Sequence, residues 1–176
     1  MRLGLHGQRR KVWFGCGVKL RQRLEMQFVW RWLYLAVDSV AGKIVWNWQE
    51  NMKRESMAAA LKQFGEKGMK RIVWDNAPSH RAKVLREEEN NLPHLHFLPP
   101  FSPELNPAER VFEEIRRHVE GKVWETIDSK VAAVEVYLTA LVKDEERVKS
   151  LVCWEWIADT VKRLPKQEME QVALIN

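Results

Sequence analysis

The sequence has little cysteine, no long apolar run and no internal repeat. Its two cysteines, Cys16 and Cys153, have neither metal-binding nor redox spacing, which predicts free thiols in a reducing cytoplasm. The longest apolar stretch, Phe28 to Val37, is interrupted by Arg31 and is too short to span a bilayer. The opening MRLGLHGQRR has no apolar core of a secretory signal. These absences exclude disulfide-rich secreted and membrane-spanning classes, and we expect a cytoplasmic protein with no membrane partner.

The composition is that of a globular domain. The chain has 176 residues, of which 45% are hydrophobic and 30% charged, and it contains nine tryptophans. This length is enough to bury a core within one domain. We expect that domain to cover residues 1–149, followed by an extension over 150–176 whose order the sequence leaves open.

Positive charge is concentrated at the N-terminal end. Residues 1–31 carry eight Lys and Arg against Glu25, a net +7, so the other 145 residues sum to −2 within the total of +5. A basic arm on a near-neutral body predicts DNA binding that weakens with salt, since phosphate neutralisation supplies most non-specific affinity. A solvated basic loop explains the charge alone equally well. The candidate DNA-binding residues of the arm are Arg9, Arg10, Lys11, Arg21 and Arg23.

Two strand-like segments follow the arm. Residues 30–37 and 43–48 flank the stretch from Asp38 to Gly42, which predicts a β-hairpin with Asp38 as a turn residue and not a metal ligand. The Trp-x-Trp pairs at 30/32 and 46/48 place both rings of each pair on one strand face. Packing of these rings against helices is favoured over base stacking.

Helices and strands then alternate. We expect helices over 54–67 and 79–89, strands over 72–74 and 94–98, and a helix beginning near Pro107. A long amphipathic helix starts at Ile127 and its apolar stripe continues to Val148. Residues 153–157 open a short helix, and the charged end from Lys162 is expected to fray. This order predicts an α/β fold, a mixed sheet with helices on both faces.

Two carboxylates stand at the ends of predicted elements, with 33 residues between them. Asp75 ends the apolar run Ile72-Val73-Trp74 before a turn, where open α/β sheets place their chemistry, although a turn or cap role explains it too. Glu109 falls in the first turn of a helix, where a capping box with Asn106 is the structural alternative. A strand-end Asp facing a helix-start Glu can share a divalent metal. Glu104 and Glu113 are the near misses.

Histidines offer a weaker metal hypothesis. His94 and His96 would share one face of a strand, but no Cys or carboxylate lies nearby at ligand spacing, so a zinc site is disfavoured.

The strings DNAPSH and LPPFSPELNPAER carry a specific resemblance. At this separation they resemble the core of the mariner-like bacterial insertion-sequence transposases, the DDE family with a ribonuclease-H-like fold. The resemblance runs from about residue 1 to residue 120 and is strongest over 71–117. It implies that Asp75 and Glu109 are the second and third catalytic acids and bind Mg²⁺ or Mn²⁺ in a two-metal site. Asn76 and His80 would be accessory residues, with a helix-terminus role for His80 equally supported.

The implied reaction is DNA phosphodiester cleavage and strand transfer of an insertion sequence. The resemblance places the first acid of the family in an Asp-Glu pair just upstream of a stretch similar to MRLGLHGQRRKVW, so we expect the opening strand and its Asp to be missing. We also expect its place in the sheet, between the hairpin and the Asp75 strand, to be empty. The implied partners are DNA at element ends and target, an upstream or frameshifted transposase portion, and a homodimer mate.

Two alternatives to a complete transposase core stay open. One is a truncated inactive remnant, or half of a split transposase, that only binds DNA or a partner chain. The other is a nuclease of the same fold that is not a transposase, which the string LPPFSPELNPAER disfavours.

Overall fold

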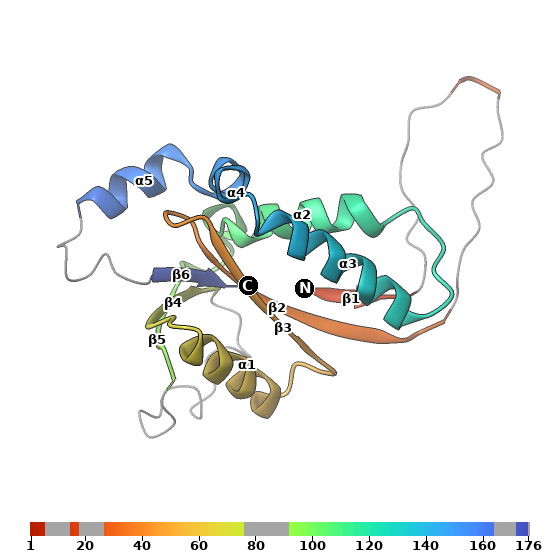
Figure 1. Ribbon diagram of the computed structural model, residues 1–176, viewed down its shortest axis with the longest axis horizontal. Helices are drawn as coiled ribbons and strands as arrows, with labels where there is room; N and C mark the ends of the chain where they lie inside the picture. The colour runs from red at the N-terminus through yellow and green to blue at the C-terminus, as the bar shows by residue number, and fades with distance from the viewer. Residues whose placement is uncertain (6–14, 18–26, 76–91, 164–171, 176) are drawn as a thin grey trace.

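A six-stranded mixed sheet forms the centre of the molecule (Figure 1). The computed structural model describes residues 1–5, 15–17, 27–75, 92–163 and 172–175. Five helices accompany the sheet in this part of the chain, with α1 on one face and α2, α3 and α4 on the other. The strands are β1 (Arg2–Gly4), β2 (Trp30–Asp38), β3 (Lys43–Gln49), β4 (Arg71–Trp74), β5 (His94–Phe97) and β6 (Val172–Ile175). The helices are α1 (Arg54–Glu66), α2 (Ala108–Val119), α3 (Ile127–Leu141), α4 (Glu145–Val152) and α5 (Glu155–Lys162).

The predicted hairpin is confirmed in β2 and β3. The two strands pair antiparallel from Trp32 opposite Gln49 to Asp38 opposite Lys43. Asp38 ends β2 as the predicted turn residue, because its Oδ1 accepts hydrogen bonds from the backbone N–H of Val40 at 3.1 Å and of Ala41 at 2.8 Å. The Asp38 carboxylate therefore stabilises the hairpin turn, at the C-terminal end of β2.

The tryptophans of the hairpin pack as the alternation predicts. Trp46 and Trp48 of β3 pack into the core under α2 and α3, and both indole N–H groups donate to Oε1 of Glu135 in α3, that of Trp46 at 2.8 Å. Trp32 of β2 packs on the α1 side, and the Arg2 guanidinium lies 4.2 Å from the ring centroid of Trp30. The four rings thus join strands to helices and to β1.

The segment from α1 to β5 builds the parallel part of the sheet. α1 places its apolar side, predicted from the sequence, against the sheet, where Met57, Ala60, Leu61 and Phe64 are buried. It leads into β4, which pairs in parallel with β5 from Arg71 opposite His94 to Trp74 opposite Phe97. The predicted helix over 79–89 lies outside the described residues.

The expectation of an empty place between β2 and β4 is wrong. β6 lies there, antiparallel to β2 (Val37 opposite Leu174) and parallel to β4 (Ile72 opposite Ala173). β1 pairs with the other end of the same edge of β2, from Arg2 opposite Trp32 to Gly4 opposite Trp30. The sequence pattern missed β6 because VALI is only four residues long and follows a charged stretch, so it has no local periodicity to recognise.

The two ends of the described chain meet on β2. Ile175 stands opposite Ala36. The Met1 amine donates to the Leu33 carbonyl at 2.7 Å, and the Leu33 N–H donates to the Met1 carbonyl at 2.8 Å. Only two β2 positions, Leu35 and Tyr34, separate these pairings. β6 and β1 therefore form one line of backbone along a single edge of β2.

The helices on the other face differ from the prediction in one respect. The apolar stripe from Ile127 to Val148 belongs to two helices, α3 and α4, because the chain turns at residues 142–144. Asp144 begins α4 by accepting a hydrogen bond at 3.0 Å from the backbone N–H of Arg147. Val148 is fully buried in the same core as Leu138. The predicted apolar stripe is therefore confirmed, and the prediction of one continuous helix is wrong.

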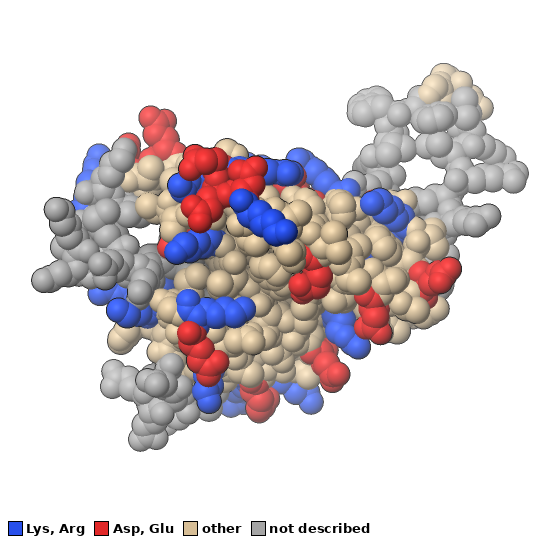
Figure 2. All heavy atoms as spheres, viewed as in Figure 1, with Lys and Arg blue, Asp and Glu red and all other residues tan. Residues whose placement is uncertain are grey.

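One face of the described surface is mixed in charge. Figure 2 shows Lys/Arg and Asp/Glu side chains interspersed over one face, with acidic side chains gathered at the position of α4, whose first turn holds Glu145 and Glu146. Both cysteines are free thiols, as predicted. Within the described residues, no helix combines the length and the apolar character that a membrane span requires.

Candidate active site

Asp75 directly follows β4, at the edge of the sheet where three parallel strands end. Ile72 and Trp74 of β4 are fully buried, and the pairing continues to this edge, where Leu98 donates to the Trp74 carbonyl at 2.8 Å. β6 and β5 flank β4 in the same direction. Asp75 thus has the place that the strand-end pattern predicts. Asn76 and His80 fall outside the described residues, so their accessory roles stay predictions.

Glu109 is set by a rigid turn ahead of α2. A 3₁₀ turn, η4 (Pro103–Leu105), ends at Asn106, whose side chain is buried and accepts a hydrogen bond at 3.1 Å from the N–H of Ala108. The backbone N–H of Asn106, which a capping-box Glu109 would take, donates to the Pro103 carbonyl at 3.0 Å. The start of the helix is therefore completed without the Glu109 carboxylate.

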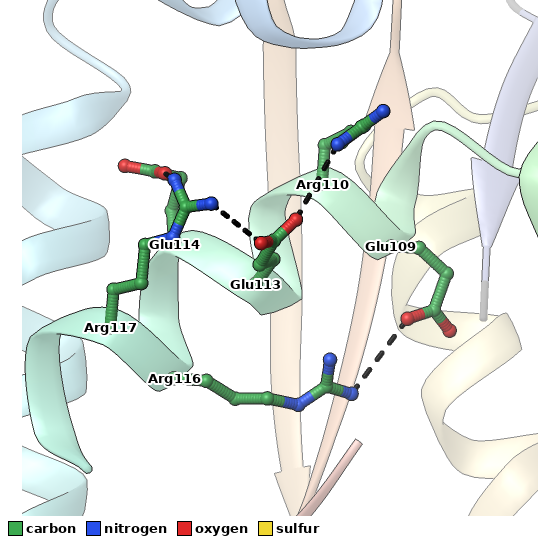
Figure 3. Close-up of polar contacts among 6 residues, drawn as sticks. All are labelled: Glu109, Arg110, Glu113, Glu114, Arg116 and Arg117. Carbon is green, nitrogen blue, oxygen red and sulfur yellow. Dashed lines mark hydrogen bonds and ion pairs between the residues drawn. The ribbon is translucent and has the colours of Figure 1, made fainter. Parts of the chain in front are cut away.

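The Glu109 carboxylate faces an arginine instead. Arg116 Nη2 lies 3.7 Å from Glu109 Oε2, seven residues on and on the same side of α2 (Figure 3). The two side chains are 43% and 32% exposed, so this ion pair contributes less than about 1 kcal/mol to stability. Its relevance is electrostatic, because it holds a cation beside a candidate metal ligand.

The neighbouring acids of α2 are engaged elsewhere. Glu113 pairs with Arg117 at 2.6 Å and with Arg110 at 3.5 Å, and Glu114 pairs with Arg117 at 2.7 Å. Figure 3 shows this network apart from the Glu109–Arg116 pair. Glu113 is thus a surface ion-pair residue, which supports the choice of Glu109 over it.

The α-amino group of Met1 is buried and donates to the Leu33 carbonyl at 2.7 Å. Burial lowers its pKa to about 5; Glu109 acts to raise that pKa, Arg116 to lower it and Asp75 to raise it. The charges of Asp75 and Glu109 therefore both act on the pKa of this amine. The distance between the two carboxylates, and hence their sharing of a metal, stays a prediction.

Sequence reasoning missed two groups of this site. Arg116 had a usable signal, since residues i and i+7 lie on one helix face and Glu109 was already singled out. Met1 had none, because its position depends on pairing with Leu33, which lies 32 residues away.

The donor chemistry fits a hard divalent cation only in part. Asp75 and Glu109 offer carboxylate oxygens, the ligands that Mg²⁺ and Mn²⁺ prefer. The described part of the chain contains no group of three or more His, Cys, Asp or Glu side chains that could hold a metal. His94 and His96 are exposed on β5 and belong to no such group there.

The basic arm stays a prediction. Arg9, Arg10, Lys11, Arg21 and Arg23 lie outside the described residues. Two other cations of the first 31 residues have described positions: Arg2 lies over Trp30, and Arg31 pairs with Asp128 at 3.8 Å.

Two solved structures are similar to this fold. The first, described as the crystal structure of the Mos1 strand transfer complex, has a TM-score of 0.64 and 16% identity over 91% of this chain and 50% of its own. The second, the Mos1 transposase paired-end complex with left transposon end, has a TM-score of 0.62 and 19% identity over 87% and 49%. This chain thus spans about half the length of either, and at these identities the likeness shows the fold alone. No curated protein matches the sequence.

A family model confirms the resemblance drawn from the strings around Asp75 and Glu109. The model described as DDE superfamily endonuclease matches residues 1–129, which include β1 to β5, α2 and both candidate acids. The chain belongs to the DDE superfamily of endonucleases.

Proposed function

We propose that this chain is the catalytic core of a metal-dependent DNA transposase that cleaves and transfers the strands of an insertion sequence. The observation that supports the proposal is the position of Asp75 directly after β4 and of Glu109 in the first turn of α2, both within the region that the family model matches. The two similar structures are transposase complexes, one with a transposon end, which supports DNA ends as the substrate.

Asp75 and Glu109 would hold the Mg²⁺ or Mn²⁺ ions. When bound, such ions activate the attacking hydroxyl and stabilise the leaving oxygen of an in-line displacement. The protein's own contribution is positional. β4 fixes Asp75 at the edge of a buried strand, and the Pro103–Asn106 turn fixes Glu109 at the start of α2. Arg116, 3.7 Å from the Glu109 carboxylate on the same side of α2, orients that carboxylate.

The second candidate function is DNA or partner binding without catalysis by this chain alone. It is favoured by the lack, among the described residues, of a third carboxylate grouped with the two candidate acids. An added upstream Asp-Glu strand would need the place that β6 holds between β2 and β4. Activity that requires such an extension would therefore also require β6 to leave its place.

A manganese-dependent nicking assay on supercoiled plasmid tests the proposal. The chain is compared with one extended upstream by a strand carrying an Asp-Glu pair, and we expect nicking in the extended form only. Asp75→Ala and Glu109→Ala should each abolish it. Glu113→Ala is the matched control, since Glu113 lies one turn from Glu109 but pairs with Arg110 and Arg117. Nicking that survives both Asp75→Ala and Glu109→Ala contradicts the active-site assignment.

A further inference from the structure

A depression of about 300 Å³ opens beside Glu109 along one side of α2. Its volume is at the lower end of the range for small-molecule sites, about 300 to 1,000 Å³, and is far too small for a duplex. Its wall carries acids, arginines and one tryptophan: Glu104, Glu109, Glu113, Arg110, Arg116 and Trp154. Glu109, Glu113 and Arg116 follow each other at helical spacing, so α2 presents them to one side.

Trp154 is the one aromatic side chain that the described residues contribute to this wall. It lies between α4 and α5, outside the 1–129 region that the family model matches. The Arg110 guanidinium lies 5.5 Å from the Trp154 ring centroid, and the Trp156 ring lies 6.1 Å from it at a tilt of 53°. The Trp154 indole gives the depression an aromatic side on the same wall as the candidate metal ligand Glu109.

The charges of the wall favour a phosphate only when a divalent cation is bound. Among the described residues of the wall, three carboxylates stand against two guanidinium groups, and their net charge of −1 disfavours a phosphate. One divalent cation on Glu109 reverses that sign. Two arginines would then be placed to donate charge-assisted hydrogen bonds to phosphate oxygens, since a guanidinium carries five N–H donors and Glu113 takes one from Arg110.

We propose that this depression holds one unpaired nucleotide of the DNA strand next to the metal-binding carboxylates, with its base on Trp154 and its phosphate beside Arg110 and Arg116. The ring faces of a base-paired nucleotide are covered by its neighbours in the stack, so only an unpaired base can lie flat on the indole. The inference rests on the proposed function and adds to it a preference for frayed or single-stranded ends.

The test is fluorescence anisotropy with labelled DNA in calcium, which binds carboxylate oxygens as magnesium does. A duplex with a short single-stranded overhang is compared with a blunt duplex of the same paired sequence. We expect the protein to prefer the overhang, and Trp154→Ala to weaken overhang binding roughly 5- to 150-fold while blunt binding is unchanged. Trp154→Phe, which keeps a ring, should retain most of the preference.

Two further variants keep the outcome interpretable. Val136→Ala is the control, because Val136 is an exposed apolar side chain of α3 that does not line the depression. Trp154→Leu fills part of the same volume without a ring and replaces Trp154→Ala if circular dichroism shows that variant unfolded; we expect it to lose the preference.

The outcomes separate this inference from the function beneath it. Equal affinity of the unmodified protein for both duplexes, or an overhang preference that survives Trp154→Leu, overturns the nucleotide site. If Asp75→Ala and Glu109→Ala still abolish nicking in that case, the proposed function stands without it. If the overhang preference depends on Trp154 but nicking is independent of both acids, the nucleotide site stands and the transposase assignment falls.

Discussion

At the scale of single residues, the Tyr34 hydroxyl is an unusual group. It is buried in the core between β2 and α1 and has no hydrogen-bond partner among the described residues. Burial raises the pKa of Tyr34 to about 12, because the tyrosinate form would lose its hydration. A buried hydroxyl without a partner costs stability at neutral pH, and its ionisation costs more.

Tyr34→Phe should therefore leave the free energy of unfolding unchanged or raise it by about 1 to 3 kcal/mol at pH 8. Because the pKa of Tyr34 is higher in the folded protein, its ionisation does not affect the free energy of unfolding below pH 10 and lowers it as the pH rises from 10 towards 12. Urea unfolding at several pH values should show a shallower loss in the variant above pH 10. Equal slopes in both proteins would contradict the burial of this hydroxyl.

The residues of the candidate site divide by the range of the interactions that place them. Asp75 and Glu109 were predictable because their positions follow from local pattern, an apolar run before a turn and a proline-rich turn before a helix. The electrostatic surroundings of Glu109 were not, since the approach of Met1 depends on strand pairing and the approach of Trp154 to Arg110 depends on the packing of a segment 44 residues away.

At the scale of elements, the hairpin turn packs closely against the start of α4. Gly42 has a φ of +69°, and a Cβ built there would lie 2.6 Å from the Glu145 carbonyl oxygen. Backbone strain and a steric clash therefore act together at this residue.

Gly42→Ala should destabilise the protein by about 2 to 4 kcal/mol, from roughly 1 kcal/mol of backbone strain and 1 to 3 kcal/mol of overpacking. Gly121→Ala is the control, because Gly121 also has a positive φ, of +80°, but a Cβ there meets open space. The difference between the two variants in thermal unfolding isolates the contact between turn and helix. Equal losses would mean that α4 does not press on the turn.

The break between α3 and α4 shows where element prediction stops. The apolar positions Val134, Leu138, Leu141 and Val148 satisfy helical spacing whether the helix is continuous or not, because both helices pack on the same core. The signal for the break was Asp144, a residue type that caps helices. The sequence around Asp144 does not show whether this capping signal or the continuous apolar spacing determines the structure.

At the scale of the whole molecule, β6 joins the two halves of the sheet. β2 pairs with one side of β6 and β4 with the other, while β3 pairs with β2 and β5 pairs with β4. Removing residues 172–176 should therefore cost at least about 3 kcal/mol, since each buried backbone group left unpaired costs about 1 to 3 kcal/mol. Removing Asn176 alone is the matched control and should cost little.

Hydrogen exchange gives the sharper measurement for this deletion. Loss of protection should appear at the amides of β4, which face β6, before it appears on the β3 side of β2. A truncated protein with unchanged protection along β4 would show that β6 does not hold the sheet together.

The mixed sheet with helices on both faces was predictable from the order of elements, because that order restricts the layers that can bury each apolar side. The occupant of the central position was not. Pairing of β6 with β2 and β4 joins segments that are far apart in the chain. The pattern of a four-residue apolar segment does not indicate with which strands it will pair.

The late position of β6 in the chain also governs how the protein is made. Ninety-seven residues separate Trp74 from Val172, so a ribosome adding about 5 to 20 residues per second needs about 5 to 20 s between completing β4 and completing β6. Throughout that interval the nascent chain displays two strand edges with no β6 between them, and exposed edges pair readily with other chains. Neighbouring ribosomes on one message carry the same unpaired edges at high local concentration. Slow translation of the last hundred residues should therefore lower the soluble yield of this protein, and chaperones that shield nascent strands should restore it.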